Sequence, residues 1–260
     1  MTTRSPSEIG ASPPRQRIQW KRGLRYLKAL MNEPDATANA MDLQFALGNR
    51  DVEGGFRRML RDPQGRALLE ARPDLLAVVA DREHLAAMSP DSLGRALLDY
   101  FDRYGFDPAS LVALWRRVED RWEREEGEPR VDPSRAWFRE RSLLLHDLFH
   151  VLSGYDADEM GEASLLAFSL GQLPGRVNRL LTLGASLEVM RVLGLAWLPY
   201  VYTAWRRGRR AVWLYPLPWE RLLERPLEEL RAEVDLEPPE RAHPGGVLRG
   251  RVADLAPARA

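Results

Sequence analysis

The sequence predicts an all-α protein, built as a single compact multi-helix domain with flexible N- and C-terminal tails. Apolar residues recur at helical spacing along most of the chain, capping residues and Gly or Pro breaks separate the segments, and no alternating strand pattern of useful length occurs. The 260 residues, 45% of them hydrophobic, suffice for a sizeable core. We expect a disordered tail over 1–14, a helical domain over 15–236 and a flexible tail over 237–260.

The first expected helix covers residues 15–31. Trp20, Leu24, Leu27 and Met31 share one face, and basic residues fill the positions between them. Further helices are expected to begin at capping residues and to end at Gly, Pro or polar turns. In the first half of the chain they cover 35–47, 51–61, 66–71, 75–88, 92–104 and 107–125.

A polar connector over 126–134 precedes the longest expected helix, which covers 134–152 and ends at Ser153-Gly154. Asp156 or Asp158 begins the next helix, which carries Glu162 and closes before Pro174. The last expected helices cover 176–193, 196–209 and 218–234.

Composition excludes several classes of protein. The formal net charge is zero, with 38 basic and 38 acidic residues, so charge gives no support to nucleic-acid binding. Cysteine is absent, which excludes disulfides, zinc–thiolate sites and a cysteine nucleophile. The first 14 residues hold no apolar signal core. The most apolar stretch, 192–205, is too short to span a bilayer and contains Pro199.

The most informative motif is His146-Asp147-Leu148-Phe149-His150, followed twelve residues later by Glu162. On a helix, His146 and His150 lie one above the other, and Asp147 falls on the same arc. Burying imidazoles and carboxylates in a leucine-rich run is costly unless they are paired. A divalent metal held by His146, Asp147, His150 and Glu162 would pair them. Zinc is the first choice, with Fe²⁺ or another divalent ion as alternatives.

Four protein ligands would close the metal site, whereas catalysis needs an open position. We therefore keep open the hypothesis that Asp147 supports the ligands rather than binding the metal. A second Asp-x-x-His pattern, Asp81 to His84, is interpreted as a solvated helix face.

At these residues the sequence resembles the family of the fourth coenzyme Q biosynthesis protein (the Coq-four family), which carries the same His-Asp-x-x-His-x(11)-Glu motif. The similarity extends to Asp62-Pro63-Gln64-Gly65-Arg66, to Ser92-Leu93-Gly94, to Gly154 and Gly161, and to Trp219-Glu220 and Leu227-Glu228-Glu229-Leu230-Arg231. It covers residues 35–235. Gly154-Tyr155 departs from the commoner turn of the family.

The resemblance implies an all-helical ubiquinone biosynthesis protein with a metal at His146, Asp147, His150 and Glu162. It implies metal-dependent, oxidative decarboxylation of a polyprenylated hydroxybenzoate ring. The implied partners are the polyprenylated quinone precursor and other ubiquinone biosynthesis proteins, with no nucleic acid and a homodimer left open. The implied location is peripheral, on the cytoplasmic face of the inner membrane in a bacterium or the matrix side of the mitochondrial inner membrane in a eukaryote.

Two stretches suit contact with lipid. The basic helix around Trp20 is one, and the other has aromatic residues flanking arginines. The members of this second set are Trp197, Tyr200, Tyr202, Trp205, Trp213, Arg206, Arg207, Arg209 and Arg210. A prenyl tail would also need an apolar groove, for which the expected wall residues are Leu165, Leu166, Phe168, Leu181, Leu187 and Met190.

Two other functions compete with the decarboxylase. The first is a non-catalytic lipid-binding scaffold that organises the ubiquinone biosynthesis complex and holds a structural metal. The second is an all-helical metal phosphohydrolase of the His-Asp type, but this class leaves His150 and Glu162 without a role.

Overall fold

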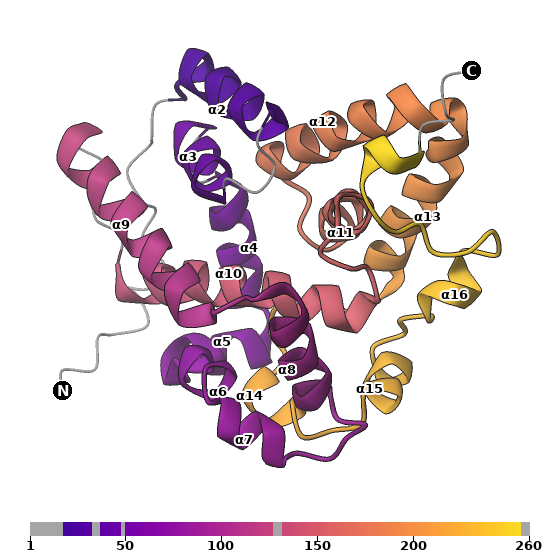
Figure 1. The fold of residues 1–260 in the computed structure, drawn as a ribbon. Coiled ribbons are helices and arrows are strands. Elements are labelled where there is room, and N and C mark those ends of the chain that lie inside the picture. The colour runs from indigo at the N-terminus through magenta and orange to yellow at the C-terminus, as the bar shows by residue number, and fades with distance from the viewer. Residues whose placement is uncertain (1–17, 33–36, 48–49, 127–131, 256–260) are drawn as a thin grey trace.

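The computed structural model describes residues 18–32, 37–47, 50–126 and 132–255. These ranges fold into a set of packed helices (Figure 1). No strand forms within them, and the only β-type contact there is an isolated bridge between Ser92 and Pro226. The predicted all-α class is confirmed. The predicted tail over 1–14 lies outside the described residues.

The helices of the first half of the chain follow the expected order. They are α2 (Trp20–Asn32), α3 (Thr37–Leu47), α4 (Arg50–Arg61), α5 (Pro63–Ala71), α6 (Leu75–Val79), α7 (Arg82–Ala87), α8 (Leu93–Tyr104) and α9 (Pro108–Glu126).

The second half begins with the longest helix of the described chain. Its elements are α10 (Pro133–Ser153), α11 (Glu159–Gln172), α12 (Arg176–Leu193), η1 (Gly194–Ala196), α13 (Trp197–Arg210), α14 (Trp219–Leu222), α15 (Leu227–Glu233), α16 (Pro239–Ala242) and η2 (Val252–Leu255).

The prediction of a single helix over 75–88 is wrong, because the chain forms two helices there, α6 and α7. The Asp81 carboxylate accepts a hydrogen bond from the backbone N–H of His84 at 2.9 Å, which starts a new helix at Arg82. Asp74 caps α6 in the same way through the N–H of Ala77. Aspartate caps stabilise helix starts by satisfying N–H groups that have no partner within the helix.

The helix expected over 218–234 is also divided. Between α14 and α15 the chain passes through Pro226, which has an extended backbone conformation with ψ of 131° and cannot donate a hydrogen bond. Leu227 N–H binds the carbonyl of Asp91 instead, which joins this segment to the start of α8.

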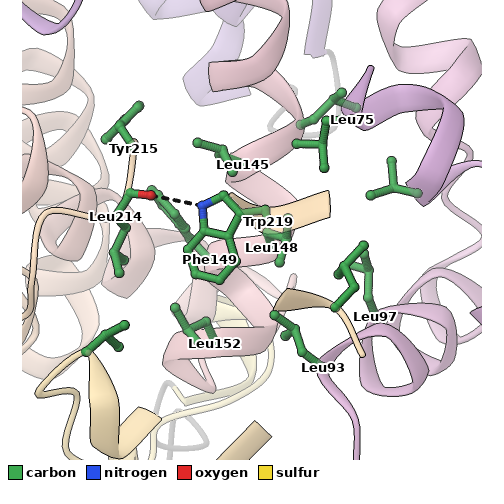
Figure 2. Packing of buried hydrophobic residues seen from close by; sticks show 14 of the residues in the cluster. Leu75, Leu93, Leu97, Leu145, Leu148, Phe149, Leu152, Leu214, Tyr215 and Trp219 are labelled. Carbon is green, nitrogen blue, oxygen red and sulfur yellow. Dashed lines mark hydrogen bonds between the residues drawn. The ribbon is translucent and has the colours of Figure 1, made fainter. Parts of the chain in front are cut away.

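The core gathers around α10, which crosses the centre of the molecule (Figure 1). Trp219 is fully buried, and its indole Nε1–H donates to the Leu214 carbonyl at 2.9 Å. Figure 2 shows this indole among apolar side chains of α10 and α8. These side chains are Leu145, Leu148, Phe149, Leu152, Leu93 and Leu97. Their burial fixes the rotation of α10 and so the direction of its polar side chains.

The sequence predicts a flexible tail from residue 237, and the structure places part of this segment against the helical body. His243 is 4% exposed, and its Nε2 lies 2.8 Å from the Tyr155 hydroxyl. Its ring stacks on Tyr200, with 3.9 Å between the centroids. Burial and the nearby Arg207 cation lower the pKa of His243 to about 4, so the imidazole is neutral at pH 7.

Candidate metal centre

The start of α10 is set by local sequence. Asp132 accepts hydrogen bonds from the backbone N–H groups of Ser134 and Arg135, at 3.0 and 3.2 Å. Pro133 occupies the first helical position, where its missing N–H costs nothing. From this start, thirteen residues of helix lead to His146, so the imidazoles are displayed from the last two turns.

The end of α10 is held by arginines from distant helices. Arg231 donates to the carbonyls of Leu152 and Val151, at 2.9 and 3.0 Å. Arg207 donates to the carbonyl of Ser153 at 2.9 Å. Three carbonyls that have no partner within the helix are thus satisfied by cations, which also interact favourably with the helix dipole. The last turn of α10, which carries His150, is therefore firmly placed.

Two glycines return the chain from α10 to α11. Gly154 ends α10 with φ of +75°, in the left-handed region that other residues rarely adopt. At Gly161, a Cβ atom would lie 1.8 Å from the carbonyl oxygen of Asp156, so only glycine allows this approach. Asp158 caps α11 through the Gly161 N–H at 2.7 Å. This tight return brings the first turn of α11, and with it Glu162, beside α10.

His146, His150 and Glu162 converge on one point. The two Nε2 atoms are 3.3 Å apart, and the His150 Nε2 lies 3.1 Å from Oε1 of Glu162. The His146 Nε2 lies 3.6 Å from Oε2 of the same carboxylate. One ligand atom from each residue falls within 4.8 Å of the others. Two imidazole nitrogens and a carboxylate oxygen are a donor set that fits zinc and related divalent ions.

The orientation of the His150 ring is fixed by a hydrogen bond at its other nitrogen, Nδ1. Its Nδ1 lies 2.8 Å from the backbone carbonyl of Tyr155, and a carbonyl can only accept, so Nδ1 carries the hydrogen. This leaves Nε2 as the nitrogen of His150 that can bind a metal, and it faces His146 and Glu162. Metal-binding histidines are commonly oriented by such an Nδ1–H to carbonyl bond. This role of Tyr155 could not be predicted from the sequence, because a backbone acceptor leaves no side-chain signature.

The charges of the three residues support one another. Burial would raise the pKa of Glu162, but the nearby His150 and His146 outweigh it and hold that pKa well below its usual range. Burial would likewise lower the pKa of His146, but the Glu162 carboxylate raises it to about 8. At pH 7, Glu162 is thus ionised, and His146 carries a positive charge that pairs with it. The His146 and Glu162 side chains remain 40% exposed, which leaves the site open to ligands.

Asp147 is placed differently from the other three predicted ligands. It is 7% exposed and does not belong to the group of converging ligand atoms. Burial raises its pKa, while His146 and His150 act in the opposite direction. The structure therefore brings together three of the four predicted residues and leaves Asp147 beside them as a buried carboxylate.

Several residues expected to contact lipid lie in the core instead. Trp197 is fully buried and Trp213 is 9% exposed. Arg207 is 5% exposed and binds backbone carbonyls, so it is not part of a basic surface. Leu165 and Phe168, expected in a groove, are fully buried core residues. A helical period identifies a buried face but does not say whether protein or ligand covers it.

The exposed apolar surface lies around the corner where α12, η1 and α13 meet, which we call the α12–α13 corner. Its large apolar side chains are 46–73% exposed, and they are Leu183, Leu187, Leu195, Leu198 and Tyr202. By length and composition the stretch Arg176–Arg210 could cross a membrane, and 17% of its most apolar window is buried. Gly194, with φ of +58°, separates its two helices. Pro199 does not break α13, because it lies in the first turn.

A family model described as "Coenzyme Q (ubiquinone) biosynthesis protein Coq4" matches residues 51–240. The relatives include mitochondrial ubiquinone biosynthesis proteins named COQ4. The chain is 28% identical to that of Ajellomyces capsulatus over 188 residues, 70% of this chain and 61% of the relative. It is 30% identical to that of Neurospora crassa over 187 residues, 70% of this chain and 48% of the relative. For Yarrowia lipolytica the identity is 28% over 207 residues, 76% of this chain and 73% of the relative.

The chain thus spans about half to three quarters of the length of these relatives. Among solved structures, a crystal structure of a "Putative ubiquinone biosynthesis protein" from Nostoc punctiforme has a similar fold. The TM-score is 0.56 at 18% sequence identity, and the match covers 85% of this chain and all of the other. At this identity the similarity concerns the fold alone.

Proposed function

The chain belongs to the coenzyme Q (ubiquinone) biosynthesis protein Coq4 family, and from this premise we propose that it is a metal-dependent decarboxylase of ubiquinone biosynthesis. Its substrate would be a polyprenylated hydroxybenzoate, which loses the ring carboxylate in a step coupled to hydroxylation of the same carbon. The proposal is supported chiefly by one observation, the convergence of His146, His150 and Glu162 on a single, partly exposed point.

The orientation and charge of the ligand residues favour binding of a divalent cation. His150 offers its Nε2 because Tyr155 holds the opposite nitrogen, and Glu162 remains ionised between the two imidazoles. To hold a cation, His146 would have to lose its Nε2 proton, so binding would release a proton below pH 8. Asp147 would stabilise the positive charge from its buried position. A bound divalent ion supplies a Lewis acid, which stabilises negative charge on substrate oxygen.

In the proposed reaction, the carbon–carbon bond between the ring and the carboxylate breaks and CO₂ leaves. The electron pair of the broken bond remains on the ring carbon. Placing a hydroxyl group on that carbon requires one oxygen atom. With dioxygen as the oxidant, two electrons and two protons from a reductant are needed to release the second oxygen atom as water. The partly exposed His146 and Glu162 line the side from which an aryl carboxylate could enter.

Release of labelled CO₂ tests the proposal. Metal-loaded protein is expected to release label from a prenylated 4-hydroxybenzoate carrying ¹⁴C in the carboxylate, and chelation is expected to stop the release. Mass spectrometry of the aromatic product under air and under argon shows whether hydroxylation accompanies carboxylate loss. Metal binding without any release of label, under air and with a reductant, would contradict the decarboxylase and favour the non-catalytic scaffold with a structural metal.

We further propose peripheral binding to an anionic membrane through the α12–α13 corner, where a polyprenylated precursor resides. Tyr202 and the leucines of this corner are exposed, and Arg206, Arg209 and Arg210 are exposed nearby on α13. Apolar and aromatic side chains beside arginines are typical of a membrane interface. The location would be the cytoplasmic face of the inner membrane in a bacterium or the matrix side in mitochondria. Other ubiquinone biosynthesis proteins are the proposed partners there.

Vesicle pelleting tests the membrane surface. The double variant Leu195→Ser, Leu198→Ser is expected to bind vesicles of phosphatidylcholine and phosphatidylglycerol at least about 10-fold more weakly. The reason is that burial of each leucine side chain in the membrane contributes about 1.5–3 kcal/mol to the binding free energy. Val212→Ser is the matched control, because Val212 is also exposed, at 46%, but lies after α13. Equal pelleting of the double variant and the wild type would exclude this corner.

A further inference from the structure

Tyr100 is the aromatic neighbour of the candidate metal centre. It lies on α8, and its ring stacks on the imidazole of His150, with 5.4 Å between the ring centroids and 25° between the planes. The side chain is held in place by burial, since the residue is only 7% exposed. One edge of the site is therefore formed by a residue 46 positions before His146 in the sequence.

The hydroxyl group of Tyr100 is buried and has no hydrogen-bond partner among the residues that the structure describes. Other tyrosines around the site are paired. The Tyr155 hydroxyl lies 2.8 Å from His243 Nε2, and the Tyr104 hydroxyl interacts with Asp156 and Arg103. An unpaired buried hydroxyl is unfavourable, so its persistence next to a candidate active site suggests a partner that arrives with a ligand.

The hydroxyl of Tyr100 is a hydrogen-bond donor at pH 7, because the pKa of a tyrosine hydroxyl is ordinarily about 10. It is also buried and has no partner in the described part of the chain. A buried donor of this kind forms a strong bond to an anionic acceptor.

A row of packed aromatic rings extends from Tyr100 to the surface. Tyr100 contacts Tyr104 and Phe106 at centroid distances of 5.1 and 5.6 Å, and Tyr104 stacks on Phe106 at 5.8 Å. Phe106 is 40% exposed. These contacts fix the position of the Tyr100 ring beside His150.

We propose that Tyr100 recognises the substrate by donating a hydrogen bond from its hydroxyl to an anionic oxygen of an aryl acid bound at the His146, His150 and Glu162 centre. This inference rests on the proposed function, because it assumes an aryl carboxylate or phenolate ligand at that centre. Tyr100 acts through recognition and positioning, and it is not a metal ligand. The bound aryl acid also supplies the hydrogen-bond partner that the Tyr100 hydroxyl lacks within the described residues.

Tyr100→Phe tests the proposal, because it removes the hydroxyl and keeps the ring that stacks on His150. The probe is 4-hydroxybenzoate, titrated calorimetrically into zinc-loaded protein. We expect the variant to bind the probe about 10-fold or more weakly, the range expected for a bond to a charged group. Zinc affinity is expected to stay within about 2-fold. The melting temperature of the metal-free variant is expected to equal or exceed that of wild type, since no partner is lost.

Tyr104→Phe is the matched control, because it removes a neighbouring hydroxyl that is paired within the protein. Its affinity for 4-hydroxybenzoate is expected to match wild type. Equal affinities of Tyr100→Phe and wild type would overturn the recognition role alone. A lowered melting temperature with weaker zinc binding would overturn it in favour of a structural role. Failure of zinc-loaded wild type to bind the probe would overturn the proposed function, and the role of Tyr100 with it.

Discussion

Glu162→Gln is expected to weaken divalent-metal binding by more than about 100-fold, since loss of a direct ligand exceeds the 10–100-fold effects of supporting residues. Glutamine keeps the shape of the side chain but removes the charge that lies between the two imidazoles. Without that carboxylate, the pKa of His146 is also expected to fall from about 8. Calorimetric titration with Zn²⁺ at pH 7, together with metal analysis of the purified protein, measures the effect.

Glu70→Gln removes the same charge from an exposed position on α5 and serves as the control. It is expected to bind Zn²⁺ as wild type does. Unchanged zinc affinity in Glu162→Gln would contradict a metal centre at these residues. The variant also separates the two proposed functions, because a folded Glu162→Gln protein that restores quinone production in deficient cells would favour the scaffold.

Trp219→Ala is expected to destabilise the fold by about 3–5 kcal/mol, which is the cost of removing a buried tryptophan side chain from a core. The indole is fully buried against α10 and α8, and its hydrogen bond to Leu214 would be lost as well (Figure 2). Because α10 carries both imidazoles, loosening its apolar face is also expected to weaken zinc binding. Urea unfolding followed by circular dichroism gives the free energy of unfolding.

Trp20→Ala provides the comparison, because Trp20 is 50% exposed on α2. Its free energy of unfolding is expected to change by about 0.5 kcal/mol or less, as is usual for surface positions. Similar losses in the two variants would show that Trp219 does not anchor α10.

Much of the fold could be predicted from local patterns. The helix expected over 134–152 agrees with α10 (Pro133–Ser153) to within one residue at each end. Its limits are local features, because the Asp132 cap and the left-handed turn at Gly154 depend on a few neighbouring residues. The division between α6 and α7 was missed, although Asp81 carries a capping signal, because the apolar period continues across the break. Local propensity and periodicity compete at such places, and the hydrogen bonds of the cap decided the outcome.

The candidate site also has a local and a non-local part. Residue patterns along the chain were enough to predict the all-helical class and the common face of His146 and His150, because a residue spacing of four fixes the direction of side chains on any α-helix. The folded structure was needed to show that Glu162 lies against these imidazoles, that Asp147 does not join the converging ligand atoms, and that Tyr100 stacks on His150. Contacts between helices depend on how buried faces pack and how each connecting loop turns, and no periodicity within one helix specifies either.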